Sequence, residues 1–233
     1  MMIAVTFALP AESREFLRCL SNKSQIDHND ISVIRGKIDH RTIEVLHTGV
    51  GEKVCRQRAG KFLHDREFDC LISAGFAGAL NDQLQVGDLL LAENFSTVDL
   101  SEARFSLPSW PIHIAHLLTV PALIDSSKER NKIAHTSGAA AVDMETEYIA
   151  RACAEHGIPL LSLRVISDTP SKPFPAPTKV LFNMERQRTV LTKLTLYLLK
   201  HPGAVPRLIA FARKIAQARE ILANVLIDVV RNL

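Results

Sequence analysis

The feature that most constrains the fold of this chain is the alternation of short apolar runs with amphipathic stretches. The apolar runs, each closed by Gly, Pro or acidic residues, indicate buried strands at residues 3–7, 31–35, 42–48, 70–74, 88–93 and 160–166. Helix-type stretches lie between several of these runs, at residues 12–20, 52–64 and 145–156. Strands that alternate with helices form a mixed or parallel sheet covered on both faces. We therefore predict an α/β fold with three layers, αβα, around one central mixed sheet.

Length and the C-terminal tail decide the domain organisation. A chain of 233 residues, 47% of them hydrophobic, can bury one substantial core, so we expect a single domain over residues 1–200. In residues 205–230 the apolar positions recur at spacings of three and four with basic residues between them, and Pro206 falls in the first turn. We predict that residues 201–233 form one long amphipathic helix packed on the domain or on a partner.

Charge, cysteines and the N-terminal run argue against several classes of protein. The net charge of +3 is mild and its basic residues are mixed with acidic ones, which gives little support to nucleic-acid binding. The four cysteines form no C-x-x-C pair and no histidine stands at ligand spacing, so we expect reduced thiols, a cytoplasmic location, no metal and no cofactor. Residues 1–11 lack a basic segment, and we expect them to form a first strand rather than a signal peptide. No run approaches the roughly 20 apolar residues of a membrane span.

The carboxyl ends of the predicted strands indicate where a ligand would bind. In open α/β sheets the ligand lies beyond those ends. Four segments occupy that position: residues 8–12, 49–51, 75–78 and 167–168. Segments 96–111 and 169–177 are rich in Pro and Ser, so we expect loops there that form a lid over the site.

Three carboxylates at or near this edge are candidates for catalysis. Asp168 ends an apolar strand, and partial burial there suits a general acid, although an N-cap or an Asx turn is an equal alternative. Glu145 and Glu12 begin helix-type stretches, where stabilisation by the helix dipole is the simpler explanation. That explanation leaves open why the acids around Glu145 follow Ala-Ala-Ala-Val rather than a capping Ser or Thr. We expect segment 75–78, Gly-Phe-Ala-Gly, to be a turn that lets a ligand approach the backbone.

Five segments carry a family resemblance in order and spacing over residues 2–200. They are Ala-Leu-Pro-Ala-Glu at 8–12, Thr-Gly-Val-Gly at 48–51, Ser-Ala-Gly-Phe-Ala-Gly-Ala-Leu at 73–80 followed by Val-Gly-Asp at 86–88, Val-Asp-Met-Glu at 142–145 and Leu-Arg-Val-Ile-Ser-Asp at 163–168. With them the chain resembles the superfamily of purine nucleoside phosphorylases and methylthioadenosine/S-adenosylhomocysteine nucleosidases. The resemblance implies a homo-oligomeric enzyme, commonly a dimer, that cleaves the N-glycosidic bond of a purine nucleoside.

The resemblance also implies roles for individual residues. Glu12 matches a glutamate that activates water, Glu145 one that binds the sugar hydroxyls, and Asp168 an acid that protonates N7 of the departing purine. The remaining substrate contacts implied in this way are Met144, Ala77, Gly78, Phe76, Leu123, Ile124, Ser167 and Arg164. Glycosidic cleavage leaves positive charge on the sugar and negative charge on the base, so a carboxylate near one and a proton donor near the other stabilise the transition state.

Water and phosphate are the two candidate nucleophiles. Phosphorylases of the family hold phosphate with a Gly-Asp-Pro-x-Arg loop and a hydroxyl in the Gly-rich segment, whereas Glu12 and Phe76 stand in those regions here. Because a carboxylate repels a phosphate dianion, we predict hydrolysis of a 5′-substituted purine nucleoside, with phosphorolysis as the alternative. A binding protein without activity is the third hypothesis, because Phe76 replaces a small residue and Leu123 replaces the aromatic that stacks on the purine.

The tail carries a second, narrower resemblance. Its Pro-Gly-x-x-Pro opening at 202–206 and its basic amphipathic helix resemble the hopanoid-associated phosphorylase-like subfamily, which acts on a nucleoside joined to a lipid. The apolar face of such a helix covers its own core, a second subunit or a membrane surface, and we favour the core or a subunit.

Overall fold

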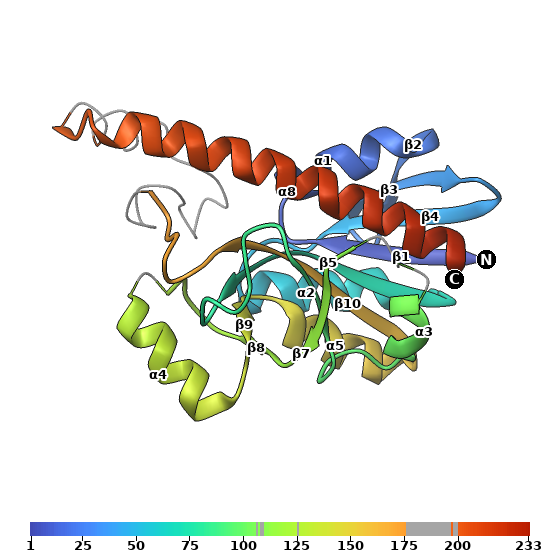
Figure 1. Cartoon of the computed structure of the whole chain (residues 1–233). Helices are drawn as coiled ribbons and strands as arrows, with labels where there is room; N and C mark the ends of the chain where they lie inside the picture. Colours follow the sequence, from blue (N-terminus) through green and yellow to red (C-terminus); the bar gives the residue numbers. More distant parts are fainter. Residues whose placement is uncertain (106, 108–109, 125, 176–196, 198–199) are drawn as a thin grey trace.

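A mixed sheet forms the middle layer of the molecule, which the computed structural model describes over residues 1–105, 107, 110–124, 126–175, 197 and 200–233. The strand order is β2-β3-β4-β1-β5-β10-β6-β7, with β9 paired to β5 and β8 to β9 (Figure 1). The strands are β1 (Met2–Phe7), β2 (Ser21–His28), β3 (Ile31–Ile38), β4 (Arg41–His47), β5 (Cys70–Ala79), β6 (Leu89–Ala92), β7 (Ile112–Ala115), β8 (Leu117–Thr119), β9 (Ala141–Asp143) and β10 (Leu160–Asp168). Strands β4, β1, β5 and β10 run parallel, so their carboxyl ends share one edge of the sheet.

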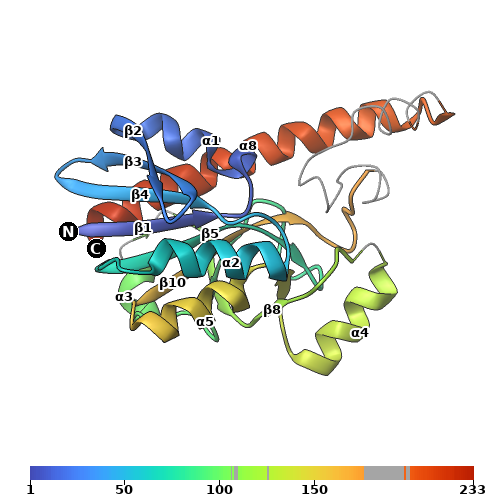
Figure 2. The ribbon, with the colours of Figure 1, turned by 180° about the vertical axis from the view of Figure 1, so that it is seen from behind.

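Helices cover both faces of this sheet because side chains alternate along each strand. Ile3 and Val5 of β1 join the core under α1 (Pro10–Cys19) and α8 (Ala204–Asn232), whereas Ala4 faces the opposite core. That second core lies under α2 (Glu52–Leu63) and α5 (Thr146–His156), as Figure 2 shows from behind. The predicted αβα architecture is therefore confirmed.

The C-terminal helix α8 divides into two halves with different surroundings. Its second half supplies Leu222, Val225 and Leu226 to the core of the sheet, and all three are fully buried. Its first half extends beyond the sheet (Figure 1). Val205 and Ile209 in this half are 39% and 49% exposed. The prediction of one long amphipathic helix over the tail is confirmed. None of the described helices is long and apolar enough to span a membrane.

Two sequence expectations near the site are wrong. Segment 75–78 is not a turn, because β5 continues to Ala79 through pairing with β10 and then with β9. Segment 96–111 is not only loop: Asp99 accepts a hydrogen bond from the Ser101 N–H and begins helix α3 (Leu100–Phe105). None of the described residues of this segment lines the cavity below, and residues 106, 108 and 109 lie outside the described part of the chain.

Two further elements gave no clear pattern in the sequence. The edge strand β2 is polar and mostly exposed, and its pairing with β3 holds it in the sheet. Helix α4 (Ser127–Ser137) lies at the periphery, begins at the cap Ser126 and ends at Gly138 with a left-handed φ of 69°.

Candidate active site

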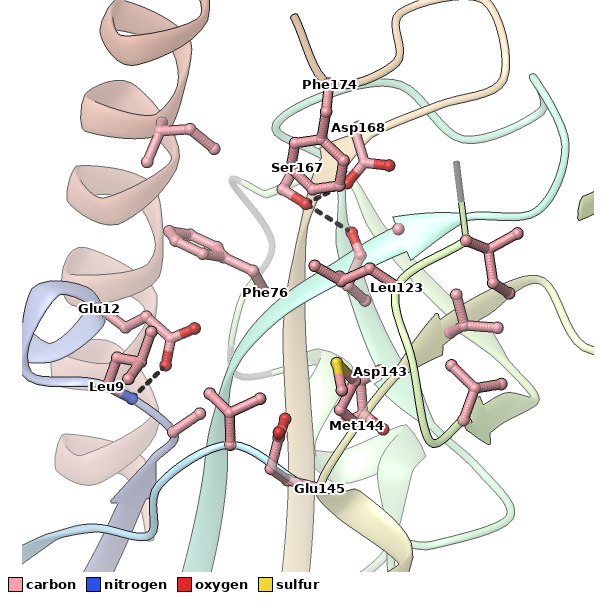
Figure 3. Close-up of a pocket in the computed structure, with 18 of the residues that line it drawn as sticks. Leu9, Glu12, Phe76, Leu123, Asp143, Met144, Glu145, Ser167, Asp168 and Phe174 are labelled. Carbon is pink, nitrogen blue, oxygen red and sulfur yellow. Dashed lines mark hydrogen bonds between the residues drawn. The ribbon is translucent and has the colours of Figure 1, made fainter. Parts of the chain in front are cut away.

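A cavity of about 370 Å³ opens at the shared carboxyl edge of β1, β5 and β10. It brings together Glu12, Glu145 and Asp168, which belong to three distant parts of the chain. Figure 3 shows Glu12 and Glu145 toward one end of the cavity and Asp168 with Ser167 toward the other, with Phe76 between them. The volume lies in the range of small-molecule sites.

Glu12 caps its own helix and also faces the cavity. It stands in the first turn of α1, and its Oε2 accepts a hydrogen bond from the Leu9 N–H at 3.0 Å. The carboxylate lies against the backbone of β5, because a Cβ added at Gly75 would come 3.7 Å from Oε2. Burial raises the pKa of Glu12 from 4.5 to about 7, although the Leu9 N–H and the positive charge of Arg164 oppose that shift. The side chain is therefore close to half ionised near neutral pH.

Glu145 directs its side chain away from its own helix. It occupies the position before α5 without capping it, and its Oε1 accepts a hydrogen bond from the Gly51 N–H at 3.1 Å. Gly51 has a φ of 88°, a conformation that suits glycine, and so the turn after β4 presents this N–H. Burial, followed by the negative charges of Asp143 and Glu12, raises the pKa of Glu145 to about 8.

The two other acids near the start of α5, Asp143 and Glu147, have different partners. The Asp143 carboxylate accepts from the Thr146 N–H at 3.2 Å and pairs with Arg164 at 3.0 Å. Glu147 lies on the surface and pairs with Arg151 one turn later. Asp143 therefore holds the start of α5 and Arg164 as well as lining the cavity, whereas Glu145 makes no contact that caps the helix.

A second, much smaller cavity of about 10 Å³ lies beside the two glutamates at one end of the larger cavity. Glu12, Glu145, Arg164, Ser73 and Thr6 are among the residues that line it. The Thr6 hydroxyl is buried and has no hydrogen-bond partner among the described residues. A polar cavity of this size holds about one water molecule.

Arg164 is the one predicted contact that does not line the larger cavity. Its guanidinium donates to the Ser73 hydroxyl at 2.8 Å and to Asp143, beneath the two glutamates. The resemblance implied that Arg164 contacts the substrate, but it stands four positions before Asp168 on β10, about 13 Å away along the extended strand at roughly 3.3 Å per residue.

Asp168 is held by two partners at the opposite end. The Ser167 hydroxyl donates to Asp168 Oδ1 at 2.6 Å, and the guanidinium of Arg130 pairs with Oδ2. Both members of this ion pair are almost fully buried, with side chains 3% and 2% exposed. The sequence analysis missed Arg130, because it stands in the polar helix α4, whose pattern resembles a solvent-facing surface.

Apolar side chains form most of the remaining wall. The predicted contacts Met144, Phe76, Ala77, Gly78, Leu123 and Ile124 all line the cavity. Three apolar residues that the sequence analysis missed add to it, namely Phe174 after β10 and Phe211 and Ile215 of α8. The rings of Phe174 and Phe211 meet edge to face with centroids 5.4 Å apart. Segment 169–177 thus contributes Phe174 to the wall of the site, and its last two residues, 176 and 177, lie outside the described residues.

Comparison with known proteins gives one family and consistent relatives. A family model described as the phosphorylase superfamily matches residues 2–117 and 100–200. A 5′-methylthioadenosine/S-adenosylhomocysteine nucleosidase of Staphylococcus epidermidis is 23% identical over 196 residues, which cover 72% of this chain and 86% of that protein.

Solved structures share the fold of this chain. The corresponding nucleosidase of Campylobacter jejuni superimposes with a TM-score of 0.75 at 17% identity over 100% of both chains. A futalosine hydrolase of Helicobacter pylori reaches 0.75 at 16% identity over 100% of this chain and 98% of its own.

Proposed function

The chain belongs to the phosphorylase superfamily, and from that premise we propose that it hydrolyses the N-glycosidic bond of a 5′-substituted purine nucleoside. The water-sized cavity beside Glu12 carries this proposal. It lies between two carboxylates and is lined by two hydroxyl groups able to hydrogen-bond water, those of Thr6 and Ser73. A phosphate dianion is too large for it and would meet the negative charge of both glutamates.

We assign the two ends of the larger cavity to the two halves of the reaction. Water attacks C1′ of the sugar, the C–N bond breaks and its electron pair passes to the base. Glu12 takes a proton from the water, a role favoured by a pKa of about 7. Glu145 accepts hydrogen bonds from the sugar hydroxyls. At the other end of the cavity, the base end, Asp168 gives a proton to N7 as the base departs. The names of the relatives, which act on methylthioadenosine and adenosylhomocysteine, support this assignment.

Release of adenine from methylthioadenosine, adenosylhomocysteine and 5′-deoxyadenosine tests the proposal. We expect release in phosphate-free buffer at a rate that added phosphate does not change, and a loss of about 10² to 10⁴ in kcat for Glu12→Gln. Turnover only with phosphate, yielding a ribose 1-phosphate, would replace hydrolysis with phosphorolysis. Binding of adenine without any turnover would support the nucleoside-binding hypothesis.

The apolar wall from α8 favours a narrower substrate class, a nucleoside with an extended hydrocarbon 5′ group such as a lipid. Phe174, Phe211 and Ile215 bring aromatic and aliphatic surface to the cavity. Each added CH₂ buried there contributes about 0.8 kcal/mol.

A series of 5′-alkylthioadenosines measures this contribution. We expect kcat/KM to rise with chain length, and Phe211→Ala to remove the rise while leaving 5′-deoxyadenosine cleavage within about threefold. The exposed Ile209→Ala is the matched control on the same helix. A flat series in the unchanged protein would contradict the hydrocarbon substituent.

We also propose that the exposed first half of α8 contacts a second copy of the chain or a membrane surface. The first half of α8 presents Val205 and Ile209 to solvent beside Arg207 and Arg213, which suits either a second copy of the chain or an anionic lipid surface.

A further inference from the structure

Arg130 is a buried cation at the base end of the cavity that the assigned roles leave unused. It projects from α4 and is 2% exposed, although the rest of that helix is mostly exposed. A guanidinium is buried so completely only when its donors are satisfied. The partners that satisfy Arg130 therefore indicate its purpose.

Those partners belong to three different parts of the site. Nη1 donates to the Ala79 carbonyl at the end of β5 at 2.9 Å, and Nε and Nη2 donate to the Ile124 carbonyl at 3.1 and 2.9 Å. Nη2 also pairs with Asp168 Oδ2. One planar group thus joins the strand under the cavity, the wall segment that includes Leu123 and Ile124, and the carboxylate at the base end.

The backbone of β5 is shaped to admit this pair. A Cβ added at Gly78 would lie 3.1 Å from Asp168 Oδ2 and 3.3 Å from Arg130 Nη1, so the pair rests directly on the strand. With Ser167 bound to Oδ1 and Arg130 to Oδ2, both oxygens of Asp168 have fixed donors. The plane of the carboxylate is therefore set before any nucleoside enters the cavity.

We propose that Arg130 is a positioning residue, which is anchored by the Ala79 and Ile124 carbonyls, orients Asp168 toward the purine base, and acts on base binding and cleavage through Asp168. This proposal rests on the proposed function only where it predicts changes in kcat and KM. Preorganised groups at the position where charge develops stabilise the transition state more than the ground state. Loss of Arg130 should therefore lower kcat more than it raises KM.

A double-mutant cycle between Arg130→Met and Asp168→Asn tests this dependence. We expect Arg130→Met to lower kcat at least tenfold with KM changed less than threefold. The double variant should be no slower than Asp168→Asn alone, because a residue that acts through another adds nothing once that residue is changed. Arg130→Lys keeps the charge but not the fork of donors, and should fall between. Arg130→Lys also takes the place of Arg130→Met in the cycle if Arg130→Met does not fold.

Arg66→Met is the matched control. Arg66 pairs with the fully buried Glu44 at 2.8 Å on β4, away from the cavity, so its loss breaks a comparable ion pair. It should lower stability, leave kcat within twofold and combine additively with Asp168→Asn. If Arg130→Met behaves like this control, or slows the Asp168→Asn protein as much as the unchanged one, the proposal is overturned.

Adenine affinity separates this proposal from the proposed function. Calorimetry on the same variants should show about tenfold weaker adenine binding in Arg130→Met, and no further weakening when Asp168→Asn is already present. If the unchanged protein cleaves no nucleoside, the hydrolysis proposal fails, and the binding cycle still decides the role of Arg130. Additive losses of affinity would refute that role.

Discussion

Two glutamates at the sugar end of the cavity lie in surroundings that oppose their charge. Burial raises the pKa of Glu12 to about 7 and that of Glu145 to about 8, and the negative charges of Asp143 and Glu12 add to the shift of Glu145. Local sequence cannot reveal this, because Asp143, Glu145 and Glu147 look alike as acids near a helix start. Only their tertiary partners separate a cap, a cavity residue and a surface ion pair.

The raised pKa of Glu12 predicts a dependence of stability on pH. The folded protein holds this proton more tightly than the unfolded chain, whose carboxyl has its ordinary value of 4.5, so the free energy of unfolding falls as pH rises from about 4.5 through about 7. Glu12→Gln removes the effect. We expect the variant to gain about 1 to 2 kcal/mol on the unchanged protein between pH 4.5 and 8, less than full burial would give because Glu12 faces the cavity.

Urea unfolding at several pH values measures that difference. The exposed Glu155→Gln on α5 is the control, and it should track the unchanged protein at every pH. A gap between Glu12→Gln and the unchanged protein that does not vary with pH would contradict the assigned cause. In the activity assay, kcat/KM should rise through about pH 7 as Glu12 loses its proton.

At the scale of elements, α8 serves two purposes along one helix. Its second half is part of the sheet core, while its first half contributes Phe211 and Ile215 to the cavity. The periodicity of the tail predicted the helix and its apolar face correctly. It could not say which surface each turn covers, since the same spacing suits a core, a subunit or a membrane.

This division predicts that substitutions in the two halves of α8 differ in their effect on the free energy of unfolding. Leu226→Ala deletes a fully buried side chain and should lower the free energy of unfolding by about 2 to 5 kcal/mol. Ile209→Ala changes a side chain that is 49% exposed and should stay within about 0.5 kcal/mol. Chemical unfolding of both variants measures the contrast. Equal losses would mean that the first half of the helix is buried in solution.

Strand β5 shows how an element can differ from its local signal. Gly75 and Gly78 suggested a turn, yet pairing with β10 and β9 keeps both in the strand. The glycines matter because side chains approach them closely, Glu12 at one position and the Arg130–Asp168 pair at the other. Glycine in a strand marks such an approach.

On the scale of the whole molecule, topology rather than any single motif assembles the site. Parallel strands β1, β5 and β10 end at one edge, and Glu12 and Asp168 come at or just after two of those ends. The turn after β4 and the short strand β9 bring Gly51 and Glu145 to the same edge. The order of strands and helices along the chain predicted that Glu12 and Asp168 meet at this edge, whereas only the family resemblance predicted that Glu145 joins them.

The amino-acid sequence by itself determined the αβα layers and the long C-terminal helix, because hydrophobic periodicity is a local property, and the family resemblance of five segments singled out the three carboxylates. Tertiary structure alone decided the partners: Arg130 on Asp168, Arg164 under the two glutamates, and the aromatic wall from α8. Charges and rings from distant segments acquire a role only when packing removes them from water and sets them against one another. Contacts between distant segments produce no pattern of residue spacing in the sequence, so the sequence alone cannot predict them.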